Sequence, residues 1–364
     1  MNKKSKNHAS ALDVSIDFGR VSLLQKMLFA KQLALMLKSG MSITDALKLI
    51  YSSSQGTFKQ IIADIYNSVK AGRGLAAVMA RYPRVFSSFF QGAVLAGEAS
   101  GNLELNLQNV AAQLKKDKEL VDKIKSALFY PVIVIVAAII IASFVALYVL
   151  PKITPLLLGF KVQLPWTTRF LIWLSAFMQA WGLYLLAAFV VMVIVAVLVI
   201  RQNWASPFFH RLYLTTPVVG NLTRNLNLSR ISFNLGILLR SGLTITESLT
   251  LVAGSLNNYY YRQALVKVAG GVTKGGSLAA SLARYPDYFP EMMLKMLKVG
   301  EESGHLEDSL LYIAEFYETE IDTATKNLAT ALEPALLIFI GLVVGFLAIA
   351  IITPIYSITG SITR

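Results

Sequence analysis

Three long stretches without a charged residue constrain this chain more than any other feature. They run from Ser126 to Leu150, from Phe170 to Ile200 and from Pro334 to Thr363. Each exceeds the roughly 20 apolar residues that an α-helix needs to cross a bilayer. The composition, with 55% hydrophobic and 15% charged residues, is also too apolar for an ordinary soluble domain. The sequence therefore predicts a polytopic membrane protein with three transmembrane helices.

Prolines and tryptophans locate the spans more closely. Pro131 and Pro151 bracket the first stretch, Pro334 and Pro354 bracket the third, and tryptophans flank the second as interface anchors. We expect a polar leader, two large polar domains and three spans. Their predicted bounds are 1–22 for the leader, 23–126 and 201–333 for the domains, 127–150, 182–200 and 334–354 for the spans, 151–181 for an outer loop with an interfacial segment, and 355–364 for an outer tail.

The distribution of charge predicts the orientation. The chain has 34 Lys and Arg against 21 Asp and Glu, a net charge of +13, and most basic residues lie in the two large polar regions. The leader has no apolar segment of the kind found in a cleaved signal peptide. By the positive-inside rule we expect the N-terminus and both polar domains in the cytoplasm, with the basic residues between Lys115 and Lys125 near anionic lipid.

The two polar domains are copies of one another. Residues 38–47, Lys-Ser-Gly-Met-Ser-Ile-Thr-Asp-Ala-Leu, return at 240–249 as Arg-Ser-Gly-Leu-Thr-Ile-Thr-Glu-Ser-Leu. Later landmarks recur at an offset larger by one residue, among them Ala-Arg-Tyr-Pro at 80 and 283 and the prolines at 131 and 334. The duplicated unit is therefore a polar domain plus the span that follows it, and one residue has been inserted within it.

Each copy is predicted to be a helical bundle, because neither shows the alternation of apolar and polar residues that is typical of strands. The pattern over 23–38 predicts a largely buried amphipathic helix, which Gly40, or Gly242 in the second copy, would end. Helical pattern without Gly or Pro from Leu103 to Tyr130 predicts a stalk that reaches the membrane at Pro131, where we expect a kink or a first-turn position. Capping boxes are expected at two equivalent places, Ser42 with Asp45 and Thr244 with Glu247.

The sequence lacks the residues and motifs that common catalytic and metal-binding sites require. There is no cysteine, and the three histidines are far apart, so we expect no metal site. Phosphate-binding, nucleophile-elbow and His-Glu-x-x-His motifs are absent, so we expect no enzyme and no cofactor. No basic and aromatic stripe points to nucleic acid. The spans contain no Asp, Glu, Lys, Arg or His, which argues against a pump or coupled transporter.

Gly-Glu-x-Ser-Gly, at 97–101 and 300–304, is the clearest polar motif. Glu98 and Glu301 each follow an arginine of the same copy, Arg81 or Arg284. Either the carboxylate is structural, accepting amides at the stalk's N-terminus or pairing with that arginine, or it belongs to a partner contact or subunit interface. The structural or partner-contact candidates are Arg81, Gly97, Glu98, Gly101, Arg284, Gly300, Glu301 and Gly304.

Gly341 and Gly345 form a Gly-x-x-x-Gly pattern in the third span. Small residues four apart allow two membrane helices to approach closely. Helix packing is therefore a candidate role for this pair, although the pattern also arises by chance in glycine-rich spans.

The ordered motifs of the two copies resemble those of the inner-membrane platform proteins of type IV pilus and type II secretion machines, the GspF/PilC family. The resemblance rests on Lys-Ser-Gly-Met-Ser-Ile-Thr-Asp-Ala-Leu, Arg-Tyr-Pro, Gly-Glu-Ala-Ser-Gly-Asn-Leu and Phe-Tyr-Pro, and it covers about residues 23–357. The chain departs from some members in its short leader, and in having Glu333 before Pro334 where the first copy has Tyr130 before Pro131.

The resemblance implies a platform without enzymatic activity that forms homo-oligomers in the inner membrane. Its implied partners are a cytoplasmic hexameric assembly ATPase, pilin or pseudopilin subunits, other inner-membrane assembly proteins and membrane lipid, and it would couple the ATPase to filament assembly. A membrane permease subunit working with a separate ATPase is the alternative, and a regulatory membrane receptor is a third possibility.

Overall fold

The computed structural model describes residues 21–149, 151–152, 166–200 and 206–362, and in these residues every regular element is a helix. The chain divides into two compact units, one made mainly of the residues up to Lys118 and the other mainly of those from Glu119 on. The all-helical class expected from the sequence is confirmed. Predicted features between 1 and 20 and between 153 and 165 lie outside the described residues.

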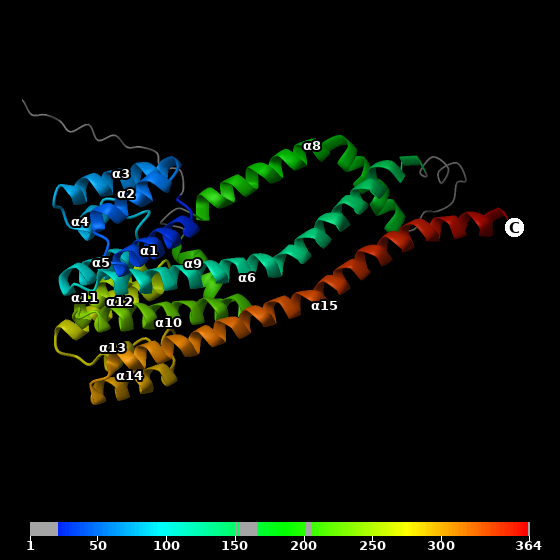
Figure 1. Ribbon diagram of the computed structural model, residues 1–364. Helices are drawn as coiled ribbons and strands as arrows, with labels where there is room; N and C mark the ends of the chain where they lie inside the picture. Colours follow the sequence, from blue (N-terminus) through cyan, green and yellow to red (C-terminus); the bar gives the residue numbers. More distant parts are fainter. Residues whose placement is uncertain (1–20, 150, 153–165, 201–205, 363–364) are drawn as a thin grey trace, which may run out of the picture. The chain divides into compact units, whose positions relative to one another are not determined.

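The first unit is a bundle of short helices followed by the start, up to Lys118, of one long helix (Figure 1). A glycine with φ near +82°, Gly40, ends the first helix, and glycine adopts this conformation without the steric cost of a Cβ atom. The helices are α1 (Leu23–Lys38), α2 (Ile43–Ser53), α3 (Gly56–Lys70), α4 (Leu75–Met79), α5 (Ser88–Ser100) and α6 (Leu103–Phe144).

Four phenylalanines form the centre of the first unit's core. Phe29 packs against Phe58 and Phe86 with ring centroids 6.0 and 5.7 Å apart, and Phe86 meets Phe90 edge-on at 5.2 Å. All four side chains are buried. Since burial of a large apolar side chain contributes about 1.5–3 kcal/mol, this cluster is a main source of the bundle's stability.

The second unit repeats the bundle after an additional membrane-type helix. Residues equivalent to the four phenylalanines are Ile231, Tyr261, Phe289 and Met293, and all are buried, so the duplication preserves the core positions while changing the side chains. The helices are α8 (Trp166–Ile200), α9 (Ser206–Thr215), α10 (Pro217–Arg240), α11 (Ile245–Ser255), α12 (Tyr259–Thr273), α13 (Leu278–Leu282), α14 (Glu291–Ser303) and α15 (Leu306–Ile362).

The residue inserted between the copies lies in a loop. Helices α2 and α11 occupy equivalent positions at the smaller offset, whereas α3 and α12 begin at the larger one. The second copy therefore has three residues, 256–258, where the first has Ser54 and Gln55. Asn258 compensates by capping α12: its Oδ1 accepts the N–H groups of Tyr260 and Tyr261 at 3.0 and 3.4 Å.

The capping pattern expected from the sequence is complete in one copy. Thr244 and Glu247 form a reciprocal capping box at α11. At α2 the Ser42 hydroxyl accepts the N–H of Asp45, but the Asp45 carboxylate bonds that hydroxyl instead of the N-cap amide. Aspartate is one methylene shorter than glutamate, which explains why the reciprocal bond is absent there.

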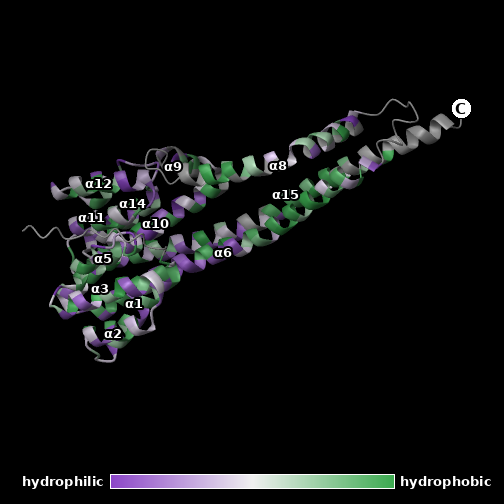
Figure 2. Cartoon of the chain, turned by 90° about the horizontal axis from the view of Figure 1, so that it is seen from above, coloured by the Kyte–Doolittle hydropathy of each residue, from purple (hydrophilic) through white to green (hydrophobic). Residues whose placement is uncertain are grey.

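Helices α6 and α15 each run without interruption from a bundle into an apolar segment. Pro131 lies inside α6, and Pro334 lies inside α15, so neither begins a helix and the expected first-turn position is wrong. In the part of the chain that the structure describes, these two helices are long and apolar enough to cross a membrane, and Figure 2 colours their apolar segments green.

Helix α8 supplies the third membrane candidate if its two parts count as one span. It bends by 69° between Ser175–Gly182 and Ala187–Val195. The helix begins at Trp166, so the segment at 166–181 that was expected to precede the span is helical as well.

Only one face of α1 is buried, which corrects the expectation of a largely buried helix. Phe29, Ala30, Leu33 and Ala34 are buried, whereas Leu35 remains 65% exposed. Leucines recur on both faces, so the sequence pattern alone did not show which face packs against the bundle.

Candidate functional site

Glu98 caps the short helix α4. Its two carboxylate oxygens accept the N–H groups of Leu75 and Ala76, at 2.5 and 3.1 Å. The N-cap residue is Gly74, which has no side chain to perform this role. A charged acceptor at a helix N-terminus is favourable because it satisfies free amides and faces the positive end of the helix dipole.

Glu301 repeats this contact in the second copy and adds a third donor. The N–H groups of Leu278 and Ala279 lie 2.5 and 3.0 Å from its oxygens, and the Ser277 hydroxyl donates at 2.6 Å. The capped helix is α13, so the amides belong to the short helix and not, as expected, to the stalk. Both glutamates tie the last helix of the bundle to the short helix before it.

The first glycine of the motif permits a close helix contact. A Cβ atom on Gly97 would lie 2.7 Å from the Cα of Leu103, and one on Gly300 would lie 2.7 Å from the Cβ of Ser309. Real Cβ atoms do not approach other heavy atoms so closely, so only glycine allows the bundle helix to cross the start of α6 or α15 at this distance.

The last glycine of the motif makes the turn into the long helix. Gly101 and Gly304 have φ values of +74° and +76°, the left-handed conformation in which helices commonly end. The motif therefore combines a contact, a cap and a turn at each junction between bundle and stalk.

The two arginines behave differently. Arg81 donates through Nη2 to Asp64 Oδ2 at 2.5 Å and to the Ser68 hydroxyl at 2.9 Å, so the pairing expected with Glu98 is wrong. The Tyr82 hydroxyl also donates to Asp64, at 2.6 Å, and burial together with this bond raises the pKa of Tyr82 to about 12.

The second copy has lost the arginine's partners. Lys267 and Gly271 stand at the positions equivalent to Asp64 and Ser68, so Arg284 cannot form the same contacts. The arginine is therefore repeated in the sequence without a repeated structural role.

This difference predicts unequal effects of two equivalent substitutions. We expect Arg81→Ala to lower the free energy of unfolding by about 0.5–1 kcal/mol, the range of a surface ion pair, because both partners are partly exposed. Arg284→Ala should change it by less. Thermal unfolding of the purified chain in detergent measures both, and equal shifts would contradict the assignment of Asp64 as the partner.

His210 connects α9 to α12 in a pH-dependent way. Its Nδ1 accepts the N–H of Tyr259 at 3.2 Å, which requires a neutral imidazole. Burial lowers the pKa of His210, and the charge of Arg262 lowers it further. The unfolded chain therefore takes up a proton at higher pH than the folded chain, and the histidine's contribution to stability is lost as the pH falls below about 6.5.

We expect the unfolding midpoint of the wild-type chain to be lower at pH 5.5 than at pH 7.5 by a modest amount. His210→Gln retains an acceptor without the titration, so it should reduce the difference. Thermal unfolding at the two pH values checks this, and an unchanged difference would rule out His210 as its source.

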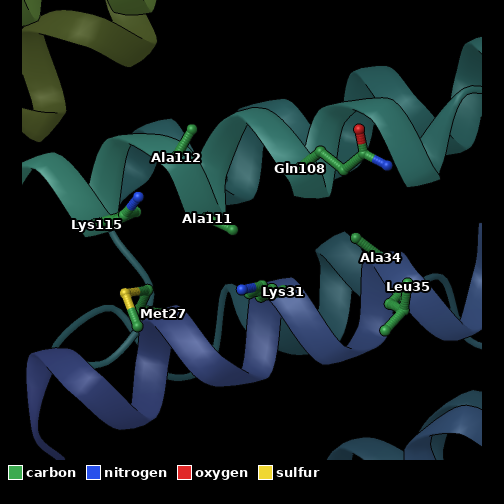
Figure 3. Close-up of a pocket in the computed structure, with 8 residues that line it drawn as sticks. All are labelled: Met27, Lys31, Ala34, Leu35, Gln108, Ala111, Ala112 and Lys115. Carbon is green, nitrogen blue, oxygen red and sulfur yellow. The ribbon is translucent and has the colours of Figure 1, made fainter.

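A groove separates α1 from the start of α6 in the first unit (Figure 3). It encloses about 400 Å³. Met27 faces Lys115 at one end, and Leu35 faces Gln108 at the other, so the two helices run antiparallel along it. No sequence motif pointed to this groove, because it depends on how two separate helices pack.

The remaining candidates lie in the apolar helices. No atom among the described residues lies within 4 Å of the Cβ position at Gly341 or Gly345, so nothing within those parts of the chain packs against them. Within the described residues there is likewise no cluster of three or more His, Asp or Glu side chains able to hold a metal ion.

Comparison with known proteins identifies similar chains over most of the sequence. The family described as "Type II secretion system (T2SS), protein F" matches twice, at residues 29–151 and 232–354. These two matches coincide with the two copies, each including its long apolar helix.

Individual relatives come from both pilus and secretion systems. "Type IV pilus assembly protein PilC" of Thermus thermophilus is 33% identical over 341 residues, 92% of this chain and 83% of that protein. The protein of the same name from Myxococcus xanthus is 31% identical, covering 96% of this chain and 84% of that protein. "Type II secretion system protein F" of Pseudomonas aeruginosa is 33% identical, covering 91% and 82%.

Proposed function

The chain belongs to the type II secretion system protein F family, and from this premise we propose that it is the inner-membrane platform of a type IV pilus or type II secretion machine. In this role it couples a cytoplasmic assembly ATPase to the assembly of pilin or pseudopilin subunits into a filament. It performs no bond-making chemistry of its own. The observation that carries the proposal is a helical bundle, present twice, each copy followed by a long helix that continues into an apolar segment.

Continuous helices suit a mechanical role. Between Leu103 and Pro131, α6 rises by about 42 Å at 1.5 Å per residue. A displacement imposed on a bundle is passed to the apolar segment through one continuous helix. The Gly-Glu-x-Ser-Gly junction holds the bundle against the start of that helix. We propose this structural role for the motif residues in both copies.

The proposed topology has both bundles in the cytoplasm, where an ATPase can reach them, and three spans. Gly341 and Gly345 then offer a close packing surface within the membrane for a second copy or for an apolar pilin helix. The lysines nearest to the apolar segment, Lys123 and Lys125, would lie towards anionic headgroups.

A deletion and reconstitution experiment tests the proposal. We expect deletion of the gene in the organism of origin to abolish surface filaments or secretion, and plasmid-borne wild-type chain to restore them. The purified chain in nanodiscs should bind the assembly ATPase encoded in the same organism and hydrolyse no ATP alone. Intact filament assembly or secretion in the deletion strain would refute the platform role. Substrate-dependent flux into liposomes would instead support the permease alternative.

A further inference from the structure

The groove between α1 and α6 has an apolar floor and a basic rim. Ala34 and Ala111 are buried in its floor, and Leu35 lines it while remaining 65% exposed. Lys31 and Lys115 are its charged lining residues, and no carboxylate lines it. A contiguous apolar surface with a polar rim is typical of an interaction site.

In the second copy, side chains fill the space equivalent to the groove. The positions of Ala34 and Gln108 are occupied there by Gly236 and Leu311. A Cβ atom on Gly236 would lie 2.9 Å from Cγ of Leu311, so the leucine fills the space against the glycine. Ile237, at the position of Leu35, is only 4% exposed.

The charges differ between the copies as well. Phe233 and Glu318 stand at the positions of Lys31 and Lys115. The basic rim is therefore specific to the first copy, and the shared bundle core does not require it. The two copies therefore differ at this place in two respects, the packing of the groove and the charge of its rim.

We propose that this groove binds an amphipathic helix of another protein, with carboxylates flanking its apolar face. Two antiparallel helices form a trough that a third helix can complete, with apolar anchors at i, i+3 or i+4 and i+7. The carboxylates of such a helix would pair with the ammonium groups of Lys31 and Lys115. Met27 at one end provides a flexible side chain that adapts to different apolar partners.

The exposed apolar surface along α1 is about as long as a docking helix. Leu24 and Leu28 are 42% and 39% exposed, and with Leu35 they extend the apolar surface along α1. The eleven steps from Leu24 to Leu35 correspond to about 16 Å, or three helical turns. This length is that of an ordinary docking helix.

Distance from the membrane argues against a lipid as the occupant. Ala111 precedes Pro131 by 20 residues within one continuous helix, a separation of about 30 Å. The proposal concerns the surface of the first unit and does not depend on which machine the chain serves.

Binding of a designed probe tests the inference. The probe is a fluorescein-labelled 18-residue helical peptide with leucines at i, i+4, i+7 and i+11 and flanking glutamates; its twin has lysines in place of the glutamates. Fluorescence anisotropy is measured against the full-length chain in nanodiscs of zwitterionic lipid. We expect the acidic peptide to bind at least tenfold more tightly than its basic twin.

Three variants localise the binding. The double variant Lys31→Glu, Lys115→Glu should reverse the preference between the peptides, whereas the control Lys48→Glu, Lys267→Glu, with the same change in net charge at exposed positions, should retain it. Ala112→Trp, at an exposed position on the groove wall, should weaken binding at least tenfold without shifting the unfolding midpoint.

Other outcomes would overturn the proposal. Equal binding of both peptides, or an acidic preference that survives the reversal of Lys31 and Lys115, would exclude the basic rim as the determinant. Displacement of the peptide by phosphatidylglycerol vesicles at stoichiometric lipid would identify a lipid site. Concentration-dependent self-association that Ala112→Trp abolishes would identify a second copy as the occupant.

Discussion

Replacing Gly97 or Gly300 by valine is expected to destabilise the chain by about 3 kcal/mol or more for each substitution. A Cβ atom on Gly97 would lie 2.7 Å from the Cα of Leu103, which is backbone and cannot rotate away. The bundle would have to separate from the start of α6 to admit the side chain, and overpacking of this kind costs about 1–3 kcal/mol even for smaller insertions. The measurement is the thermal unfolding midpoint of the purified full-length chain in detergent.

Gly270 provides the matched control. It lies inside α12, and no atom of the described residues lies within 4 Å of its Cβ position. Gly270→Ala should leave stability unchanged or increase it by up to about 1 kcal/mol, because alanine is the better helix former. If Gly97→Val unfolded at the wild-type temperature, the proposed close contact between α5 and α6 would be wrong.

Removing the carboxylates of Glu98 and Glu301 is the second large effect that we expect. Each substitution by alanine leaves two amides of a short helix without their charged acceptor, at a cost of about 1–3 kcal/mol. The effect of Glu301→Ala should be the larger, because the Ser277 hydroxyl also loses its acceptor. Unfolding midpoints in detergent measure both, and the double variant should show nearly additive losses because the two sites are in separate copies.

Substitution of a neighbouring glutamate, Glu302, shows whether the loss of stability comes from the lost cap or from the lost charge alone. Glu302 is 67% exposed and lies 3.8 Å from Lys298 in an i, i+4 pair, an interaction worth about 0.5 kcal/mol or less. Glu302→Ala should therefore cost far less than Glu301→Ala. Equal losses would show that the backbone bonds to Leu278 and Ala279 are not what makes Glu301 important for stability.

Local patterns in the sequence were enough to predict the helices and the duplication. The first helix was expected over 23–38 and runs from Leu23 to Lys38, because capping residues and Gly40 mark its ends. The expected stop at Gly242 is a left-handed residue as well. Such features depend on neighbours within a few residues, which a single sequence displays.

Contacts between distant segments were not predictable in the same way. The motif around Glu98 indicated a junction, but the amides it accepts belong to Leu75 and Ala76, more than twenty residues earlier. The partner of Arg81 is Asp64 on α3, which carries no distinguishing pattern. The basic groove was missed for the same reason, since it arises only when α1 lies alongside α6.

The composition predicted which segments form long apolar helices. It predicted less well where each of these helices begins and ends. Tryptophans near 166–181 suggested an interfacial segment before a span at 182–200, and the structure adds that both parts belong to one bent helix, α8, which begins at Trp166. Proline was expected either to kink a helix or to occupy its first turn; Pro131 and Pro334 lie within long helices, which excludes the first-turn position. An internal proline removes one hydrogen bond, and the many remaining bonds allow the helix to continue.

Cysteine labelling measures the central claim, that both helical bundles face the cytoplasm and are anchored there by the apolar helices. The chain has no native cysteine, so single cysteines at exposed loop positions, Gln55→Cys and Asn257→Cys, report one bundle each. Lys161→Cys reports the loop expected on the outer side. With a membrane-impermeant maleimide on intact spheroplasts, we expect labelling at 161 alone, and labelling at 55 and 257 only after lysis. Labelling of either bundle position in intact spheroplasts would contradict it.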